Sequence, residues 1–307
     1  MDRARRRPLI LDVKGNSLDD GPGIRTVVFF KGCPLDCAWC HNPESKRAGV
    51  ELAFDPKECV KCETCLSACA EGALDRADAG FVDRRRCTLC FECVEACPSG
   101  ALSRVGRDME VSEVIELVKR DVTFFETSGG GVTLSGGEPT LFMDYCSELL
   151  RGLKGLGIHT VVETCGYFDP SEFQRLVYPY TDDIYYDLKI FDREEHARMC
   201  GVSNEVILQN FVDLQNRFEA GGVPLLARVP LIPGITATDA NLESLAGFLV
   251  ESGANRVAVL QYNPLFKEKA ANVGARDPLA GAPGTGSWMS PAEVRRCRDS
   301  LKGLEVL

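Results

Sequence analysis

The apolar residues of this 307-residue chain follow two periods that alternate along its length. Short apolar runs, such as RTVVFF at 25–30 and IHTVVE at 158–163, are typical of buried strands. Between such runs, segments such as 111–120 place apolar residues three and four positions apart, which is the spacing of one helical face. Strands that alternate with helices predict an α/β fold, with a parallel sheet and helices outside it.

The alternation continues to the carboxyl end of the chain and sets the expected size of the fold. Further strands are predicted at 129–140, 183–190, 224–230 and 256–262. Further helices are predicted at 141–154, 171–178, 193–200, 204–220, 239–252 and 291–302. The number of units fits an open partial (β/α)6 barrel better than a closed eight-unit barrel. Ligands of such folds bind at the carboxyl ends of the strands.

Composition and charge narrow the range of partners. The formal net charge is −10, which disfavours binding to nucleic-acid phosphates. Apolar runs do not reach the roughly 18 residues of a membrane span, and the basic start MDRARRRPLI lacks the apolar core of a secretory signal. Fifteen cysteines in such a chain argue against a disulfide scaffold. We therefore expect a reducing, oxygen-poor cytoplasm.

Three of the cysteines, Cys33, Cys37 and Cys40, form a C-x3-C-x2-C triplet in KGCPLDCAWCHNPES. In a closed [4Fe–4S] site each of the four irons is held by a cysteine thiolate. Three cysteines leave one iron without a protein ligand, and that iron can bind a small molecule. The triplet resembles that of the radical S-adenosylmethionine (SAM) enzymes, whose open iron chelates SAM. A zinc site is the alternative, but zinc sites prefer two separated cysteine pairs.

Eight more cysteines form two copies of C-x2-C-x2-C-x3-C, the spacing of bacterial ferredoxins. In two-cluster ferredoxins the fourth cysteine of each copy ligates the other cluster, so the predicted ligand sets cross between the copies. One set is Cys59, Cys62, Cys65 and Cys97, and the other is Cys87, Cys90, Cys93 and Cys69. Metal ligation would stabilise an insert of about 50 residues, which has too little core of its own. The sequence leaves open whether these clusters relay electrons or only support the structure.

The motifs divide the chain into three segments. Residues 1–54 form the first part of a radical SAM core, including the cluster loop. Residues 55–105 form a ferredoxin-like insert for two clusters, and residues 106–307 complete the partial barrel.

Six further motifs accompany the triplet. They are DGPGIRTVVFFKG (20–32), GGGVTLSGGEPT (129–140), ETCGY (163–167), YYDLKIFD (185–192), GVSN (201–204) and ARVPLIPG (227–234). Over nearly its full length the chain thereby resembles the glycyl-radical-enzyme activating enzymes. The resemblance implies that SAM is reductively cleaved and that a hydrogen atom is taken from a backbone glycine of a partner glycyl radical enzyme. The products are 5′-deoxyadenosine and methionine, and the electron comes from a donor such as flavodoxin or ferredoxin.

The resemblance also implies which residues contact SAM, in the cluster loop and at the strand ends. They are Trp39, Cys40, His41, Gly136, Gly137, Glu138, Glu163, Asp187, Leu188, Lys189, Arg228 and Asn263. Gly136 and Gly137 would let the backbone approach the SAM amino group, because glycine has no Cβ. Lys189 and Arg228 would lie near the SAM carboxylate, and Lys189 joins the three cluster cysteines as a catalytic residue.

Three positions depart from the pyruvate formate-lyase activating enzyme. Glu163 stands where an aspartate binds a monovalent cation, Tyr185 where a methionine carbonyl joins that site, and Asn263 where a histidine contacts SAM. The resemblance implies a cation held by Glu163, Thr164, Tyr185 and Asp187.

Two other functions compete with this one. A radical SAM maturase of another protein or peptide usually carries its extra clusters in a C-terminal extension, whereas here they follow the first triplet. A multi-cluster electron-transfer protein would form no deoxyadenosine. The remaining cysteines show no ligand spacing and are expected to be buried as small apolar residues. They are Cys146, Cys165, Cys200 and Cys297.

Overall fold

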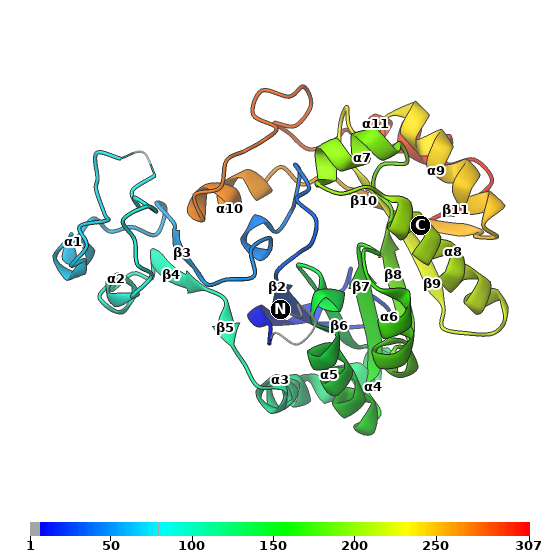
Figure 1. Cartoon of the computed structure of the whole chain (residues 1–307), viewed down its shortest axis with the longest axis horizontal. Helices are drawn as coiled ribbons and strands as arrows, with labels where there is room; N and C mark the ends of the chain where they lie inside the picture. Colours follow the sequence, from blue (N-terminus) through cyan, green and yellow to red (C-terminus); the bar gives the residue numbers. More distant parts are fainter. Residues whose placement is uncertain (1–6, 79) are drawn as a thin grey trace.

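A large, mostly parallel sheet forms the body of the protein (Figure 1). The computed structural model describes residues 7–78 and 80–307, and within them this sheet has nine strands in the order β11-β10-β9-β8-β7-β6-β2-β1-β5. The strands are β1 (Leu9–Ser17), β2 (Arg25–Lys31), β5 (Arg107–Asp108), β6 (Gly131–Gly136), β7 (His159–Thr164), β8 (Asp183–Asp187), β9 (Leu225–Leu231), β10 (Arg256–Gln261) and β11 (Glu305–Val306). All neighbours from β2 to β11 are parallel, while β1 is antiparallel to β2 and β5. The predicted α/β fold with a mostly parallel sheet is confirmed.

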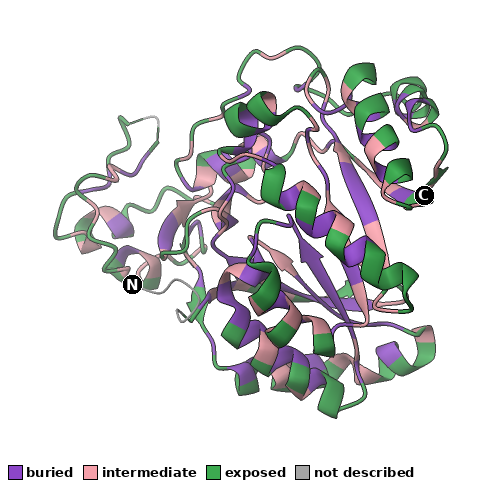
Figure 2. Ribbon diagram, turned by 45° about the vertical axis from the view of Figure 1, so that its right-hand side comes forward, coloured by how far each residue is buried: buried purple, intermediate pink, exposed green. Residues whose placement is uncertain are grey.

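Helices follow the strands and cover the sheet, whose central strands are buried (Figure 2). They are α3 (Val111–Val118), α4 (Val122–Ser128), α5 (Met143–Gly155), α6 (Pro170–Leu176), α7 (Arg193–Cys200), α8 (Glu205–Glu219), α9 (Asp239–Glu251), α10 (Phe266–Asn272) and α11 (Pro291–Ser300). Helix α5 shows why these segments are helical. Its residues Cys146, Leu149, Leu150 and Leu153 are spaced for one face, and all are buried in the core.

Most predicted elements agree with the structure to within a few residues. The strand predicted at 183–190 is too long, because β8 ends at Asp187. The prediction missed β1 and α10, and it missed α4, whose sequence VTFFETS is rich in strand-favouring residues. The basic run at residues 1–6 lies outside the described residues. Among the described residues, every helix is too short or too polar to cross a membrane.

The register of β7, β8 and β9 brings four polar side chains to one face of the sheet. Glu163 pairs with Tyr185, and Asp187 pairs with Arg228. Residues directly opposite in register point to the same face, and side chains alternate along each strand. The neighbours Thr164 and Tyr186 therefore point to the other face.

A smaller unit extends from the side of the sheet (Figure 1). It holds β3 (Glu51–Phe54) and β4 (Leu102–Val105), which pair antiparallel, and the short helices α1 (Thr64–Ala68) and α2 (Glu92–Glu95). Its buried apolar residues form a cluster separate from the main core. They are Leu52, Cys65, Leu74, Phe81, Val82, Cys93 and Leu102.

A buried ion pair joins this smaller unit to the end of β2. The Lys31 ammonium donates to Glu51 Oε2 at 2.5 Å and to the Glu44 carbonyl at 2.6 Å. The Lys31 side chain is fully buried and that of Glu51 is 10% exposed. Burial lowers the pKa of Lys31, while Glu51 opposes that shift. Such a pair is costly to break, because the remaining charge stays buried.

We expect Glu51→Gln to destabilise the protein by about 3 kcal/mol, because it leaves the Lys31 charge without its carboxylate. Anaerobic urea unfolding followed by circular dichroism measures the change. The matched control is Glu268→Gln, which breaks an exposed pair with Lys57 and should leave the free energy of unfolding nearly unchanged, because solvent screens that pair. Equal effects of the two substitutions would contradict a special role for the buried pair.

Candidate functional site

The triplet loop begins directly after β2, at the carboxyl edge of the parallel strands. Its backbone is fastened on two sides. On one side Gly32 N donates to Ser45 O at 2.6 Å. On the other, Asp36 N and Ala38 N donate to the carbonyls of Cys200 and Met199 at 2.8 and 2.9 Å. Of the triplet, Cys37 is buried, and Cys33 and Cys40 are half-buried.

Trp39 is 5% exposed and packs in the main core together with Cys37. Burial raises the pKa of Cys40 to about 12, so its thiol keeps its proton until a metal replaces it. The loop thus carries one buried and two half-buried thiols.

The turn after β6 lies directly against this loop. Gly137 N donates to Phe30 O, and Glu138 N donates to Gly32 O, both at 2.8 Å. A Cβ on Gly136 would lie 2.5 Å from Phe30 N, and one on Gly137 would lie 2.2 Å from Gly32 O. Gly136 also has a φ of +101°. Gly136 and Gly137 therefore allow close approach of the backbone at Phe30 and Gly32, just before the triplet. The sequence did not predict this contact.

Glu138 joins this turn to the end of β7. It is 1% exposed, and its carboxylate accepts hydrogen bonds from Thr140 N, Thr140 Oγ1, Thr164 Oγ1 and Cys165 N at 2.7–3.1 Å. Glu138 therefore fixes the ETCGY segment relative to the turn, and through the turn relative to the triplet loop.

A row of side chains with alternating charge crosses β7, β8 and β9, on the sheet face that carries Glu163, Asp187 and Arg228. Arg228 Nη1 donates to Glu163 Oε1 at 2.5 Å, and Arg228 Nε donates to Asp187 Oδ1 at 2.9 Å. Lys189 Nζ donates to Asp187 Oδ2 at 3.3 Å, and Ser135 Oγ donates to Glu163 at 2.5 Å. Burial favours the neutral form of Asp187, but Arg228 and Lys189 outweigh it and hold the pKa of Asp187 below its usual value. The pKa of Lys189 is raised despite burial, because Asp187 and the thiol of Cys37 are close.

Of the expected cation ligands, Glu163, Tyr185 and Asp187 share one face of the sheet, and the Thr164 side chain lies on the other. The Thr164 hydroxyl donates to Glu138 on the far side of β7, away from Glu163. The Arg228 guanidinium lies between Glu163 and Asp187 and stands over the Tyr185 ring, 5.4 Å from its centroid. Arg228 pairs with both carboxylates and Lys189 with Asp187, so basic side chains already occupy part of this set, and the monovalent cation stays a prediction.

Three predicted residues lie apart from the charged chain. Leu188 is 1% exposed and packs in the core, while its N–H donates to Arg228 O at 2.9 Å. Asn263 accepts a local hydrogen bond from Leu265 N at 2.9 Å. His41 is exposed, and its carbonyl accepts from Lys269 of α10 at 3.4 Å. The Leu188 side chain is thus turned into the core, and the contact of this residue with SAM stays a prediction that only its backbone could satisfy.

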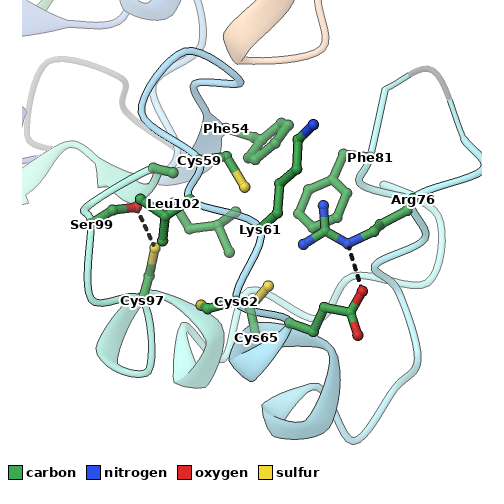
Figure 3. Close-up of a pocket in the computed structure, with 13 residues that line it drawn as sticks. Phe54, Cys59, Lys61, Cys62, Cys65, Arg76, Phe81, Cys97, Ser99 and Leu102 are labelled. Carbon is green, nitrogen blue, oxygen red and sulfur yellow. Dashed lines mark hydrogen bonds and ion pairs between the residues drawn. The ribbon is translucent and has the colours of Figure 1, made fainter.

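The eight ferredoxin-type cysteines surround two pockets in the smaller unit. One pocket is lined by Cys59, Cys62, Cys65 and Cys97, with Phe54, Phe81 and Leu102 (Figure 3). The other is lined by Cys69, Cys87, Cys90 and Cys93, with Leu52 and Phe91. The structure therefore groups these cysteines across the two copies. In residues 7–78 and 80–307, no three His, Cys, Asp or Glu side chains converge as they would around a single metal ion.

The two copies also share an unusual backbone. Lys61 and Glu63 in the first copy, and Leu89 and Phe91 in the second, have φ values of 58–65°. Left-handed residues other than glycine cost about 1 kcal/mol or more each, and they persist only where their surroundings hold them. Four such residues at matching positions fit loops that wrap a bound group. Burial also raises the pKa of Cys93 to about 11, so a metal would have to displace its proton.

Two cysteines that spacing did not connect to the triplet lie beside it. Cys165 follows β7 and Cys200 ends α7, and both are buried as expected. A side-chain hydrogen bond from Cys200 lowers the pKa of Cys37. More than 100 residues separate both cysteines from the triplet, so spacing could not connect them to it. The one sequence feature that pointed to the site was the position of Cys165 in the ETCGY motif, at a strand end.

Comparison with known proteins gives the family. Residues 84–246 match the Radical SAM superfamily, residues 51–109 a 4Fe-4S dicluster domain, and residues 19–71 a 4Fe-4S single cluster domain. The trans-4-hydroxy-L-proline dehydratase activating enzyme of Clostridioides difficile is 39% identical, over 85% of this chain and 86% of that protein. The isethionate sulfite-lyase activating enzyme of Nitratidesulfovibrio vulgaris is 40% identical, again over 85% and 86%.

This chain belongs to the glycyl-radical-enzyme activating enzymes. The activating enzyme is a radical SAM protein with 4Fe-4S clusters, and its partner is a glycyl radical enzyme. A radical SAM methyltransferase from Sphaerobacter thermophilus shares its fold, with a TM-score of 0.53 and 14% identity over 98% of this chain and 76% of that one. The predicted family and reaction are confirmed, and the reading as an electron carrier is set aside.

Gly137→Ala should displace the triplet loop of the activating enzyme, because the new Cβ would meet the Gly32 carbonyl at 2.2 Å. We expect a lower thermal unfolding midpoint, with a loss above about 1 kcal/mol, and less iron bound to the triplet. The matched control is Gly155→Ala at the end of α5, where the added Cβ meets nothing within 4 Å. A Gly137→Ala protein as stable and as iron-rich as this control would refute the close-contact role.

Proposed function

We propose that the loop of Cys33, Cys37 and Cys40 holds a [4Fe–4S] cluster whose open iron binds SAM beside Lys189. The observation that carries this proposal is that three thiols lie on one fastened loop and that the thiol of Cys37 lies close to the buried ammonium of Lys189. The motif supplies three cysteine ligands for four irons, which suits a cluster with one open iron. When bound, the cluster and SAM supply a one-electron cleavage that yields methionine and a 5′-deoxyadenosyl radical, which takes the glycine hydrogen.

The protein's part is binding, orientation and charge. Lys189 has a side chain that is 11% exposed and held by Asp187, so its ammonium is placed to meet the SAM carboxylate. Arg228 keeps Asp187 ionised and in position, and it is itself held by Glu163. Glu138 and the two glycines fix the turn against the loop, and Trp39 closes the buried side. We assign Lys189 to direct contact with SAM and Arg228 to positioning.

We further propose that residues 55–105 form an inserted domain on an open partial (β/α)6 barrel, and that this domain holds two more clusters. The crossed ligand sets are supported by the two cysteine-lined pockets and by the repeated left-handed backbone. The apolar walls of both pockets suit a buried cluster, because a dry shell sets its potential. With the triplet cluster, this makes three.

We propose that the two added clusters pass electrons to the triplet cluster from a flavodoxin or a ferredoxin. Helix α10 supports a fixed separation, because it contacts both sites. Lys269 donates to Asn42 Oδ1 at 3.2 Å beside the triplet, and Glu268 pairs with Lys57 at 2.6 Å beside the first cysteine copy. Free thiols at all fifteen cysteines support a reducing cytoplasm as the setting.

Anaerobic protein reconstituted with iron and sulfide, then given SAM and dithionite, should form 5′-deoxyadenosine. With a glycyl radical enzyme partner added, an EPR doublet of a glycyl radical should appear. Cys37→Ala should abolish both signals, and Cys297→Ala, a buried cysteine elsewhere in the core, should keep both. Deoxyadenosine from the Cys37→Ala protein would contradict the assigned site.

If the added clusters relay electrons, the effect of losing them on the rate of deoxyadenosine formation should depend on which reductant is used. Cys62→Ala and Cys90→Ala alter the exposed ligand of each added cluster, and they should slow deoxyadenosine formation with flavodoxin or ferredoxin. With dithionite, a small reductant that reaches the triplet cluster directly, the rate should stay close to that of the native protein. Unchanged rates with the protein donors would show that the added clusters are structural.

A further inference from the structure

The ladder of β3 and β4 has one end attached to the main sheet. At that end Glu51 pairs with Val105, and the Glu51 carboxylate holds the buried Lys31 at the end of β2. Strand β4 is followed at once by β5, which pairs with β1 of the main sheet. The opposite end of the ladder, where Phe54 pairs with Leu102, is therefore the end farther from these attachments.

The two cysteine-lined pockets lie at different levels of this ladder. Leu52, one residue from the attached end, lines the pocket of Cys69, Cys87, Cys90 and Cys93, here called the inner pocket. Phe54 and Leu102, at the far end, line the pocket of Cys59, Cys62, Cys65 and Cys97, here called the outer pocket. Leu52 and Phe54 point to the same face of the ladder, and two residues of a strand span about 7 Å. The inner pocket is therefore the nearer of the two to the main sheet.

The helices of the smaller unit follow the same order. Helix α1, which carries Cys65 of the outer pocket, lies at the outer edge of the unit, and α2, which carries Cys93 of the inner pocket, lies nearer the main sheet (Figure 1). Helix position and ladder level thus agree on which pocket is inner.

A half-buried arginine ties the inner pocket to the side of the triplet. Arg84 Nη1 donates to Leu52 O at 2.8 Å, and Arg84 Nη2 donates to Asn272 O, at the end of α10, at 3.3 Å. Helix α10 in turn contacts the segment that follows the triplet, where Lys269 Nζ donates to Asn42 Oδ1 at 3.2 Å. A continuous set of contacts therefore runs from the wall of the inner pocket to the triplet loop.

The outer pocket is tied to α10 by an ion pair in solvent. Lys57, two residues before Cys59, pairs with Glu268, and both side chains are more than half exposed. Such pairs fix little, because water screens them. Val60, which lines the outer pocket, is 65% exposed, so another protein can reach this part of the unit.

We propose that the inner pocket is the electron site next to the triplet, that the outer pocket is the site at which a reduced one-electron carrier protein delivers its electron, and that Arg84 is the positioning residue that holds the inner pocket against α10. The carrier is oxidised by one electron, the triplet site is reduced by one electron, and no atom is transferred. The order matters because electron transfer slows steeply with distance. The inference rests on the proposed function, since it takes the ligand sets and the relay from it.

The test is EPR of the loaded, dithionite-reduced protein. Reduced clusters that lie close together broaden each other's signals and speed each other's spin relaxation. The SAM-binding cluster is followed through the part of the spectrum that changes when SAM is added. Replacing Cys87 and Cys90 together by Ala should narrow that signal and slow its relaxation. Replacing Cys59 and Cys62 together by Ala should leave the signal close to native.

A second variant keeps every cysteine. Arg84→Ala should weaken the same broadening, and it should slow deoxyadenosine formation with reduced flavodoxin but not with dithionite. The matched control is Arg85→Ala, which changes the neighbouring arginine, whose side chain is 93% exposed. The control should keep both the native broadening and the native rate.

Narrowing that follows loss of the outer set would overturn the proposed order. Equal narrowing in the two double variants, each keeping the iron of two clusters, would overturn it as well. Native broadening in the Arg84→Ala protein would overturn the role of Arg84. Native protein in which SAM alters no part of the spectrum would contradict the proposed function instead.

Discussion

The site depends on one close backbone contact, between the carboxyl end of β2 and the turn after β6. Gly137 N and Glu138 N donate the hydrogen bonds to Phe30 O and Gly32 O, and the close approach leaves no room for a Cβ on Gly136 or Gly137. The triplet loop starts directly after Gly32, and Lys31 anchors the smaller unit on the same strand end. The turn after β6, the triplet loop and the smaller unit therefore all attach to the carboxyl end of β2. A small shift of that backbone would move all three.

Charge balance shapes the rest of the site. Glu163, Arg228, Asp187 and Lys189 alternate in sign across three neighbouring strands, so each buried charge has an opposite partner. The charged group of this row that lies nearest to the triplet is positive, since the ammonium of Lys189 lies close to the thiol of Cys37. That sign suits a carboxylate ligand and a cluster that gains an electron.

Sequence was sufficient for the central parallel strands, for most helices and for the crossed grouping of the eight ferredoxin-type cysteines, because strand periodicity and ligand spacing are local properties. It failed where the outcome depends on the tertiary fold. Arg228 bridges two carboxylates through strand register, and Thr164 points to the other face through alternation along β7, and neither arrangement could be predicted from local sequence. The neighbours Cys165 and Cys200 of the triplet were likewise invisible, because only the fold brings β7 and α7 to it.

The pairing of β3 with β4 has a consequence for how the chain folds. β2 and β6 are adjacent in the sheet, yet about 100 residues separate them in sequence, and closing so long a loop slows folding. Pairing of Glu51 with Val105 brings the two ends of the insert together and shortens the effective loop. A unit with so little core of its own closes best when metal holds it. Iron–sulfur assembly in this unit would thus speed the closure that the central parallel sheet depends on.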